Sequence, residues 1–595
     1  MTLLASGDPD SSGGIPQSRP SSRWQTLRRL SRRQWLYLPR LFPRRERIFI
    51  VVLVLIAISS ASALSARVVW RVTVPQPAVG GTLREGALQE PRFINPIYAS
   101  SDTDRALAAL VFSQLVRYNP AGEIEMDLAE DVVVASDGKA YTVNLRRGVQ
   151  WHDGEDFTAD DVLYTIRTIQ DPGYQSPLRA NWQGVTAEKL NDYTVRFSLR
   201  QPYAPFMENL AVGIVPAHLW ERIPRDGAPL SDLNLKPVGT GPYQFDKFTR
   251  REDGVITLVA LKRYKNHHRG SPFVKEIRFS FYPSEERMVA AYRRGEIDAL
   301  PVATPDAIAA LAELDAEIHE MNIPKVFGVF LNASTQPILG KRTLREALSH
   351  AIDRERIIRE TTNGGQAIGS ALPPGTIGFR DDLKPAAYDP DLARELIAQD
   401  GWKDADEDGV LERSETDANR RKVTRKLEVI ITTADTPELA GAANLIAEMW
   451  RAVGVKTEVR ALATANLEAD VIRPRSYEIL IFGEAFSHEP DPYAFWHTSQ
   501  LKDPGLNIAL YSNPTVDNLL AEARGLADRD ARAERYRQFQ KIVSDEIGAI
   551  FLYSPRTYYA IRQSTNGVQL TAVALPEDRF ADIHRWYQDT RRALK

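Results

Sequence analysis

One uncharged apolar run near the N-terminus constrains this chain more than any other feature. It extends from Ile48 to Ala66 and is bounded by Arg47 and Arg67, with no charged residue in between. As a helix it would be about 28 Å long, close to the roughly 30 Å thickness of a membrane's hydrocarbon core. The sequence therefore predicts one transmembrane helix over 48–66.

Positive charge is concentrated before this run. Residues 1–47 contain ten arginines and three acidic residues, a net charge of +7, whereas the whole chain carries −3. Arginine-rich flanks stay in the cytoplasm, so we expect 1–47 to be a cytoplasmic basic arm, disordered at first and then interfacial. The rest of the chain is expected outside the membrane, in the periplasm or at the cell surface. Nucleic-acid binding is the alternative for the arginines, but their place beside the apolar run disfavours it.

Two fates of the apolar run stay open. The stretch from Ser59 to Ala66 is rich in Ser and Ala and resembles a signal-peptide cleavage site. A preceding segment of 47 residues is long for a cleaved signal, which favours a retained single-pass signal anchor. The prolines of VTVPQPAVGG then predict an extended linker over 67–80.

The remaining chain has the features of a large folded protein. The whole chain has 595 residues, 43% of them hydrophobic, so it is too long for one ordinary domain. It contains no cysteine, which excludes disulfides, thiolate metal sites and a lipid-modified cysteine anchor. Apolar patterns predict strands at 141–145, 194–199, 276–281 and 427–431, and helices at 104–115, 159–168, 285–294, 343–361, 439–453 and 516–524. An α/β class follows.

Sequence signatures of catalysis are missing. The chain contains no HExxH, no GxSxG and no GxxxxGK[ST] motif. We therefore expect a binding protein and not an enzyme.

Residues Leu128 to Ile169 carry a family resemblance. They combine a strand, an Asp137-Gly138 turn, a second strand, the segment WHDG and a helix that Thr158 can cap. This stretch resembles the signature region of family 5 extracellular solute-binding proteins, the dipeptide- and oligopeptide-binding group. Further segments are similar to that family in the same order, namely 93–122, 237–245, 325–334, 344–358, 401–412, 491–500 and 507–524.

The resemblance implies a two-lobed periplasmic-binding-protein fold of the larger type, with an extra inserted domain. Carried onto this chain, lobe I combines 81–111, 206–304 and 555–595, the inserted domain is 112–205, and lobe II is 305–554. Two crossings, near Leu300–Pro305 and Phe551–Pro555, are expected to form the hinge.

The same resemblance implies a function. The chain is expected to be the receptor of an ABC importer, which captures a small solute such as a peptide and delivers it to permease subunits in the membrane. A receptor that senses solute without transport, and an envelope protein with a vestigial cleft, are the alternatives. A monomer is the default expectation.

The segment from Phe482 to Gln500 is the expected ligand site. In peptide-binding relatives an aspartate four residues before the proline of an Asp-Pro pair holds the ligand's α-amino group. Pro492 is that proline here, so His488 takes the aspartate's position. Nearby carboxylates could substitute, and the loop before 439–453 lacks the arginine that dipeptide-specific members carry, which argues against strict dipeptide specificity. The expected ligand contacts are Glu484, Phe486, His488, Asp491 and Trp496, with Asn95, Tyr98 and Asn332 in addition; burial in a lobe core is the alternative for the aromatic residues.

One metal pattern stands apart. Asp404, Asp406, Asp408 and Glu415 have the spacing of an EF-hand calcium loop. The residues after Glu415, DANRRKVTRKLEVII, predict a hairpin and a strand, not the helix that leaves an EF-hand. The pattern therefore allows calcium, with a plain acidic turn as the alternative, and no other cofactor is expected.

Overall fold

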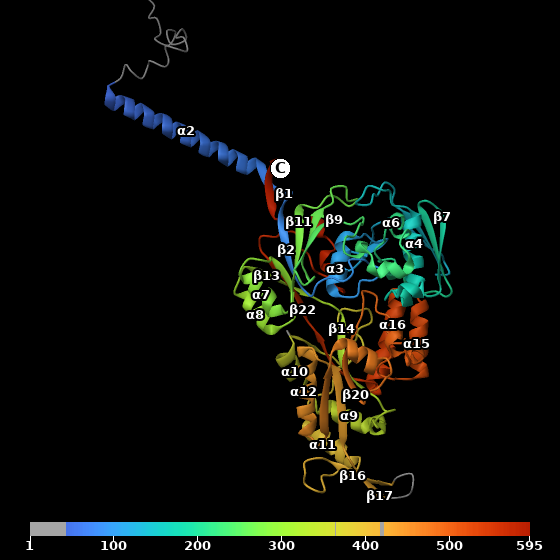
Figure 1. Ribbon diagram of the computed structural model, residues 1–595. Helices are drawn as coiled ribbons and strands as arrows, with labels where there is room; N and C mark the ends of the chain where they lie inside the picture. Colours follow the sequence, from blue (N-terminus) through green and yellow to red (C-terminus); the bar gives the residue numbers. More distant parts are fainter. Residues whose placement is uncertain (1–42, 363, 417–421, 595) are drawn as a thin grey trace, which may run out of the picture. The chain divides into compact units, whose positions relative to one another are not determined.

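The computed structural model describes residues 43–362, 364–416 and 422–594 (Figure 1). They fall into two compact units. The first holds the chain up to Gln76 together with the C-terminal residues from Arg591, and the second spans Pro77–Thr590. The basic arm expected over 1–47 lies outside the described residues except at its last positions.

A single long helix, α2 (Arg44–Val72), makes up most of the first unit. Its 29 residues give a length of about 43 Å, and no other helix among the described residues is long and apolar enough to cross a membrane. Its apolar side chains are exposed, as expected for contact with lipid.

The predicted linker over 67–80 needs correction. Residues 67–72 continue α2, and Thr73–Ala78 form strand β1, which pairs with β23 (Asp589–Leu594). The Thr73 hydroxyl donates to the Val69 carbonyl, and Pro75 follows, so the helix cannot continue. The Arg592 guanidinium lies 3.9 Å from the Trp70 ring centroid and fixes the end of α2 against β23.

The second unit contains two large sheets. The first has seven strands in the order β13-β22-β12-β2-β11-β10-β9. Their bounds are β2 (Gly80–Leu88), β9 (Tyr243–Arg250), β10 (Ile256–Arg263), β11 (Val274–Tyr282), β12 (Ala299–Val302), β13 (Ala316–Met321) and β22 (Thr557–Arg562). Helices α3 (Asp102–Val111), α7 (Glu285–Arg293) and α8 (Pro305–Ala312) belong to this lobe.

The second sheet has six strands in the order β15-β21-β14-β20-β18-β19. Their bounds are β14 (Lys325–Leu331), β15 (Gly365–Ala367), β18 (Glu428–Ala434), β19 (Lys456–Leu462), β20 (Ile479–Ala485) and β21 (Ile550–Pro555). Its helices are α9 (Arg342–His350), α10 (Arg354–Thr361), α11 (Pro390–Gln399), α12 (Pro437–Arg451), α15 (Pro514–Gly525) and α16 (Arg529–Asp545). The helix predicted over 343–361 is two helices, because the Asp353 carboxylate accepts from the Arg356 N–H and starts α10 afresh.

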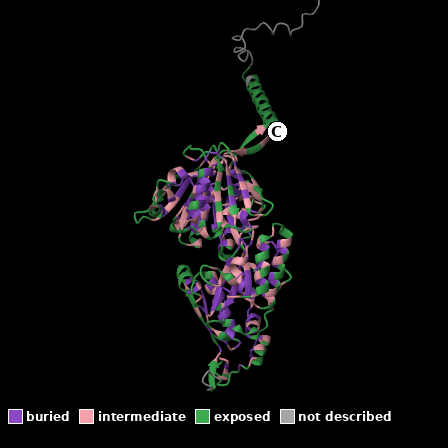
Figure 2. Ribbon diagram, turned by 90° about the vertical axis from the view of Figure 1, so that its right-hand side faces the viewer, coloured by how far each residue is buried: buried purple, intermediate pink, exposed green. Residues whose placement is uncertain are grey.

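A smaller antiparallel sheet lies within the region expected as an inserted domain. It has the order β5-β6-β8-β7, with β5 (Ala129–Val134), β6 (Ala140–Leu145), β7 (Val185–Asn191) and β8 (Thr194–Leu199). Gly138 turns the chain between β5 and β6 at a φ of +67°, and Thr158 with Asp161 forms a capping box on α4 (Ala159–Gln170). Its apolar residues share one core with the seven-stranded sheet, so this region and lobe I are packed as one body. Figure 2 shows buried residues inside both lobes.

The chain crosses between the two large sheets twice. Residues 322–324 join β13 to β14, and Arg556 joins β21 to β22. The lobe boundary expected at 305 and the crossing expected near Leu300–Pro305 are therefore wrong, because α8 and β13 remain with the first lobe. Strand β12 begins the segment that was expected to cross between the lobes. It stays in the first lobe, where the Arg84 guanidinium binds the neighbouring Asp298 at 2.8 Å. The second crossing follows the expected segment Phe551–Pro555 directly.

The segment 237–245, PVGTGPYQF, forms a turn that packs against the end of α3. A Cβ on Gly239 would lie 1.9 Å from the Val111 carbonyl oxygen. We expect Gly239→Ala to destabilise the protein by about 2 kcal/mol or more, because backbone must shift to relieve the clash. Gly525→Ala, where a Cβ meets nothing within 4 Å, is the control. Thermal unfolding of the two variants checks this, and equal melting temperatures would contradict the packing described.

Candidate functional site

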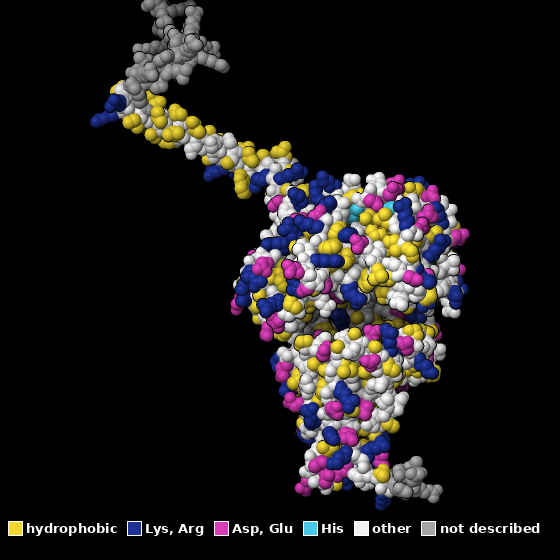
Figure 3. Space-filling model, viewed as in Figure 1, with side chains coloured by type: hydrophobic (Ala, Val, Ile, Leu, Met, Phe, Trp, Pro, Cys, Tyr) yellow, Lys and Arg dark blue, Asp and Glu magenta, His cyan; other side chains and the backbone are white. Residues whose placement is uncertain are grey.

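A cavity of about 1440 Å³ lies between the two lobes. The hollow is visible between the upper and lower halves of the space-filling view (Figure 3). Both lobes contribute walls, including Tyr118, Trp182, Arg200, Tyr203 and Glu208 from the first and Ala485, Phe486, Asp491, Phe495 and Lys502 from the second. A cavity shared by two bodies that are joined by two short crossings can open and close by rotation about those crossings.

The end of β20 brings the predicted ligand loop to this cavity. The Phe486 N–H donates to the Pro324 carbonyl at 2.9 Å, which ties the loop to the first crossing. The Phe486 ring packs edge-on against Phe495 at 5.1 Å, and both rings line the cavity. Of the five residues predicted in this loop, Phe486 and Asp491 are at the cavity wall.

Asp491 is already engaged by a cation. Its carboxylate accepts from Arg524 Nη2 at 2.6 Å and from the Tyr203 hydroxyl at 3.2 Å. Arg524 comes from α15 in the second lobe, whereas Tyr203 comes from the first lobe, so this cluster bridges the two. The guanidinium also lies 3.6 Å from the Tyr493 ring centroid. Asp491 therefore stabilises the contact between the lobes and is not free to bind an amine.

His488 makes a second contact between the lobes. Its Nε2 lies 2.9 Å from Asp578 Oδ2, and its ring stacks on Tyr118 with centroids 3.7 Å apart. Asp578 and Tyr118 both belong to the first lobe, and His488 is not part of the cavity lining. The residue that occupies the position of the relatives' amine-binding aspartate thus joins the lobes to each other.

A third contact involves a buried carboxyl group. The Ser487 hydroxyl of the second lobe donates to Glu208 Oε2 at 2.8 Å in the first. Burial raises the pKa of Glu208 from 4.5 to about 7. Together with the clusters at Asp491 and His488, this contact joins the two lobes.

Glu484 and Trp496 lie behind the cavity wall, in the core of the second lobe. They are 2% and 0% exposed, and the Trp496 indole N–H donates to Glu484 Oε2 at 3.2 Å. Burial raises the pKa of Glu484 from 4.5 to about 8. Glu484 Oε1 has no hydrogen-bond partner among the described residues. The expectation that these two side chains contact ligand is corrected: they pack the lobe.

Asn95, Tyr98 and Asn332, the three other predicted ligand contacts, do not line the cavity either. Asn95 donates to Asn234 Oδ1 at 3.0 Å and holds a turn, and Tyr98 packs against Phe93 with ring centroids 5.3 Å apart. Asn332, at the end of β14, donates to the Arg475 carbonyl at 3.1 Å. All three are buried. The two amide groups hold the fold through these hydrogen bonds, whereas the Tyr98 hydroxyl has no hydrogen-bond partner among the described residues.

Sequence reasoning missed the first-lobe partners of the loop. Tyr118, Tyr203, Glu208 and Asp578 lie far from 482–500 in sequence, and none belongs to a motif with a chemical signature. Three charged residues at the cavity, Arg200, Lys502 and Asp503, have no ion-pair partner among the described residues. They are the cavity charges left for a guest.

The EF-hand pattern does not form an EF-hand. After the acidic loop come β16 (Glu412–Thr416) and β17 (Lys422–Lys426), an antiparallel hairpin. Arg413 binds the Glu415 carboxylate, and Lys426 binds Asp408. Among the described residues, neither Asp408 nor Glu415 belongs to the group of carboxylate oxygens that lie close together on this loop.

The buried Glu484 predicts a pH-dependent stability. Its pKa is 4.5 when unfolded and about 8 when folded, so its ionisation lowers the stability of the fold as pH rises between these values. Glu484→Gln cannot ionise and keeps an oxygen for the Trp496 N–H. We expect it to unfold at nearly the wild-type temperature at pH 5 and to be more stable at pH 8, by at most about 4 kcal/mol.

Thermal unfolding across this pH range measures the effect, with the exposed Glu130→Gln as control. A difference between Glu484→Gln and wild type that does not change with pH would contradict the assignment.

Comparison with known proteins identifies the family. The model of "Bacterial extracellular solute-binding proteins, family 5 Middle" matches residues 123–506. The oligopeptide-binding protein AppA of Bacillus subtilis is 24% identical over 522 residues, which cover 86% of this chain and 92% of AppA. Heme-binding protein A of Haemophilus influenzae is 27% identical over 463 residues, which cover 73% of this chain and 80% of that protein.

Solved structures show the same fold. AppA from Bacillus subtilis in complex with a nonapeptide superposes with a TM-score of 0.71 at 24% identity, over 86% of this chain and 99% of that one. The ABC transporter substrate-binding protein CtaP from Listeria monocytogenes gives 0.72 at 24% identity, over 86% of this chain and 100% of that one. Because the family model matches well over half of its length, the chain belongs to family 5 of the bacterial extracellular solute-binding proteins.

Proposed function

We propose that this chain captures an oligopeptide, or a small solute of similar shape, in the interlobe cavity and presents it to the permease of an ABC importer. The size of the cavity carries the proposal. At about 1440 Å³ it exceeds the 300–1,000 Å³ of ordinary small-molecule pockets. An extended guest of several residues fits such a space better than a single amino acid does.

An unpaired strand edge supports a peptide guest. Strand β18 pairs with β20 only at Ile479 and Leu480, so 481–485 have no strand on that side among the described residues. Ala485 lines the cavity. A peptide that adds a strand at such an edge is held by main-chain hydrogen bonds, which do not depend on its sequence. The names of AppA and of its nonapeptide complex agree with this kind of ligand.

The pairing of the loop carboxylates argues against a dipeptide held by its α-amino group. Asp491 binds Arg524, Glu489 binds Arg532 at 2.8 Å, and Glu484 is buried. Taking one of these groups for a ligand amine would break an existing ion pair or expose the core. The ligand is therefore held mainly by main-chain, aromatic and shape contacts, with Arg200, Lys502 and Asp503 as the free charges.

Binding couples to closure. A solute that contacts both walls stabilises the closed arrangement over the open one, and the permease can distinguish the two. The chain's part in this cycle is binding and release without a covalent step, so it acts as a receptor and not as an enzyme. It works as a monomer, because one chain supplies both walls of the cavity.

The N-terminal helix serves as the anchor. Helix α2 as a retained single-pass segment, with the arginine-rich arm in the cytoplasm, places the two-lobed unit outside the membrane. A tethered receptor stays at high effective concentration near its permease, so the docking contact can be weak.

Removing residues 1–72 tests the separation of anchor and receptor. We expect a soluble protein with unchanged solute affinity, because the cavity lies entirely within Pro77–Thr590. A peptide at 100 times its dissociation constant should stabilise it by about 2.7 kcal/mol, which thermal-shift screening of a peptide library detects. Aggregation of the truncated protein, or no stabilisation by any peptide or other solute, would contradict the proposal.

The His488 contact predicts a second effect. His488→Ala removes the interaction with Asp578 and Tyr118, so the open state becomes more populated and the apparent affinity for solute falls roughly tenfold. His350→Ala is the control, because that imidazole forms its hydrogen bond with the Ala387 carbonyl within the second lobe. Calorimetric titration with a peptide that binds the wild type measures the affinity of each variant. An affinity of His488→Ala equal to that of His350→Ala would show that His488 does not contribute to closure.

A further inference from the structure

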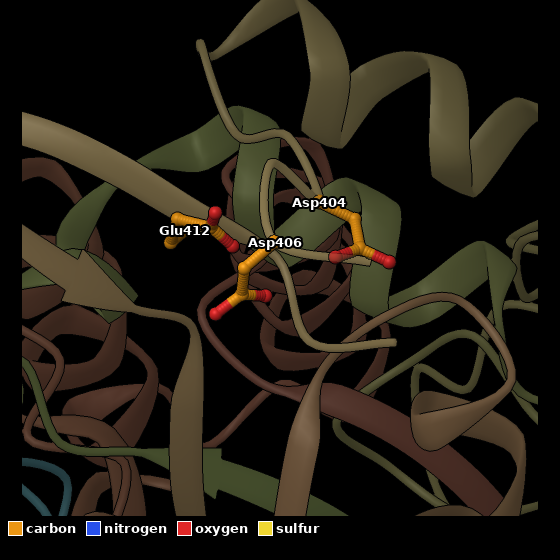
Figure 4. Close-up of side chains that lie close together, drawn as sticks. All are labelled: Asp404, Asp406 and Glu412. Carbon is orange, nitrogen blue, oxygen red and sulfur yellow. The ribbon is translucent and has the colours of Figure 1, made fainter. Parts of the chain in front are cut away.

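Three carboxylates gather on a loop that the solute cavity does not use. The loop joins α11 to the hairpin β16–β17, which Figure 1 places at the tip of the second lobe. One oxygen from each of Asp404, Asp406 and Glu412 lies within 4.8 Å of the other two. Figure 4 shows the three side chains around one turn of the chain.

The base of this loop is fixed to the lobe. Lys403 and Glu412 exchange two main-chain hydrogen bonds, of 3.0 and 2.8 Å. The Leu411 N–H donates to the Gly454 carbonyl at 2.9 Å, and Trp402 just before the loop is 1% exposed. The carboxylates are thus attached to a framework that holds them together even though like charges repel.

Glu412 provides the observation that points to a ligand. Glu412 is 8% exposed, and its Oε1 accepts a hydrogen bond from the Ala405 N–H at 2.8 Å. Its other oxygen, Oε2, is buried and has no hydrogen-bond partner among the described residues. A buried carboxylate oxygen without a donor or cation is costly. A bound cation would satisfy it.

The charge of the cluster is only partly balanced. The Lys426 ammonium contacts Asp406 at 3.2 Å and also binds Asp408. Among the described residues no basic side chain pairs with Asp404 or Glu412, and Asp404 Oδ2 accepts only the Gly409 N–H, at 3.0 Å. Two negative charges therefore lack a counter-charge where the oxygens converge.

We propose that Asp404, Asp406 and Glu412 bind one calcium ion. Calcium is coordinated by oxygens at about 2.3–2.6 Å, so two of its ligands lie at most about 5 Å apart, in agreement with the spacing here. Asp404 and Asp406 are exposed, which leaves coordination positions for water. An open site of this kind has an expected dissociation constant of about 10⁻⁴–10⁻³ M, as in extracellular modules.

The site departs from an EF-hand in one informative way. Glu412, at the ninth position of the loop, takes the role that Glu415, at the twelfth position, would have in an EF-hand. Glu415 forms an ion pair with Arg413 instead. The ion joins the two ends of the loop, Asp404 and Glu412, at the root of the hairpin. Calcium therefore stabilises the second lobe and leaves the affinity of the cavity for solute unchanged.

Calcium binding to the full-length protein in detergent tests the proposal. After removal of metal with EDTA, equilibrium dialysis against radioactive calcium should show one ion per chain, saturating below about 10 mM, with magnesium binding at least about tenfold more weakly. The melting temperature should rise with calcium over the same range.

Variants assign the site. Glu412→Gln keeps the oxygen that accepts from Ala405, so the loop can fold, and should weaken calcium binding at least about tenfold. Asp404→Asn, on the exposed side, should act likewise. Glu415→Gln should bind as the wild type does. Circular dichroism without metal confirms that each variant is folded.

Two outcomes would overturn the proposal. One is calcium binding by wild type that is no stronger than by a double variant carrying Glu412→Gln and Asp404→Asn. The other is loss of binding in Glu415→Gln with retention in Glu412→Gln, which would restore the EF-hand assignment. Neither outcome depends on the solute, so this site and the proposed transport function can fail separately.

Discussion

Two short crossings determine what the rest of this molecule can do. In the part of the chain that the structure describes, the backbone passes between the large sheets only at 322–324 and at Arg556. Strand β13 pairs with β22 directly beside these crossings. The Arg556 guanidinium lies 3.3 Å from Glu320, so the crossings run next to each other. Because each lobe has its own apolar core, a rotation at this point costs little packing. Opening and closing then depends on the contacts that the lobes make at the cavity.

Those contacts are polar and few. Asp491 with Tyr203, His488 with Asp578, and Ser487 with Glu208 are hydrogen-bonded or ionic pairs between the two lobes. Each contributes on the order of 1 kcal/mol net, because water competes for the same groups when the lobes separate. Closure without solute is therefore only weakly favoured, and a guest that contacts both walls can decide the balance. A larger apolar interface would lock the lobes and prevent release.

The sequence predicted most elements because their signals are local. Capping at Thr158, the turn at Gly138 and the uncharged run 48–66 each depend on neighbours along the chain, and each is found in the structure. The prediction of the lobe boundary at 305 failed because β12 and β13 are short strands without a sequence signature of their own. Only their hydrogen-bonding partners, β2 and β22, assign them to a sheet. The break between α9 and α10 rests on one capping aspartate within an otherwise helical pattern.

The site was harder to predict for the same reason. Phe486 and Asp491 were placed at the cavity by a loop that is recognisable in sequence. Whether a polar residue there faces the cavity, the core or the other lobe depends on residues far away in the sequence, such as Tyr203, 288 positions from Asp491, and Asp578, 90 positions from His488. Glu484 shows this well, since a carboxyl group expected to hold a ligand is paired with an indole inside the lobe.

The distance between the lobes is the most direct measure of closure around a solute. The chain contains no cysteine, so cysteines introduced at the exposed positions Glu130 in the first lobe and Lys541 in the second can carry spin labels without other changes. Pulsed electron paramagnetic resonance should give a broad distribution of distances between the two labels without solute. The distribution should become narrower and move to shorter distances when a peptide saturates the cavity. An identical distribution with and without bound peptide would contradict closure around a guest.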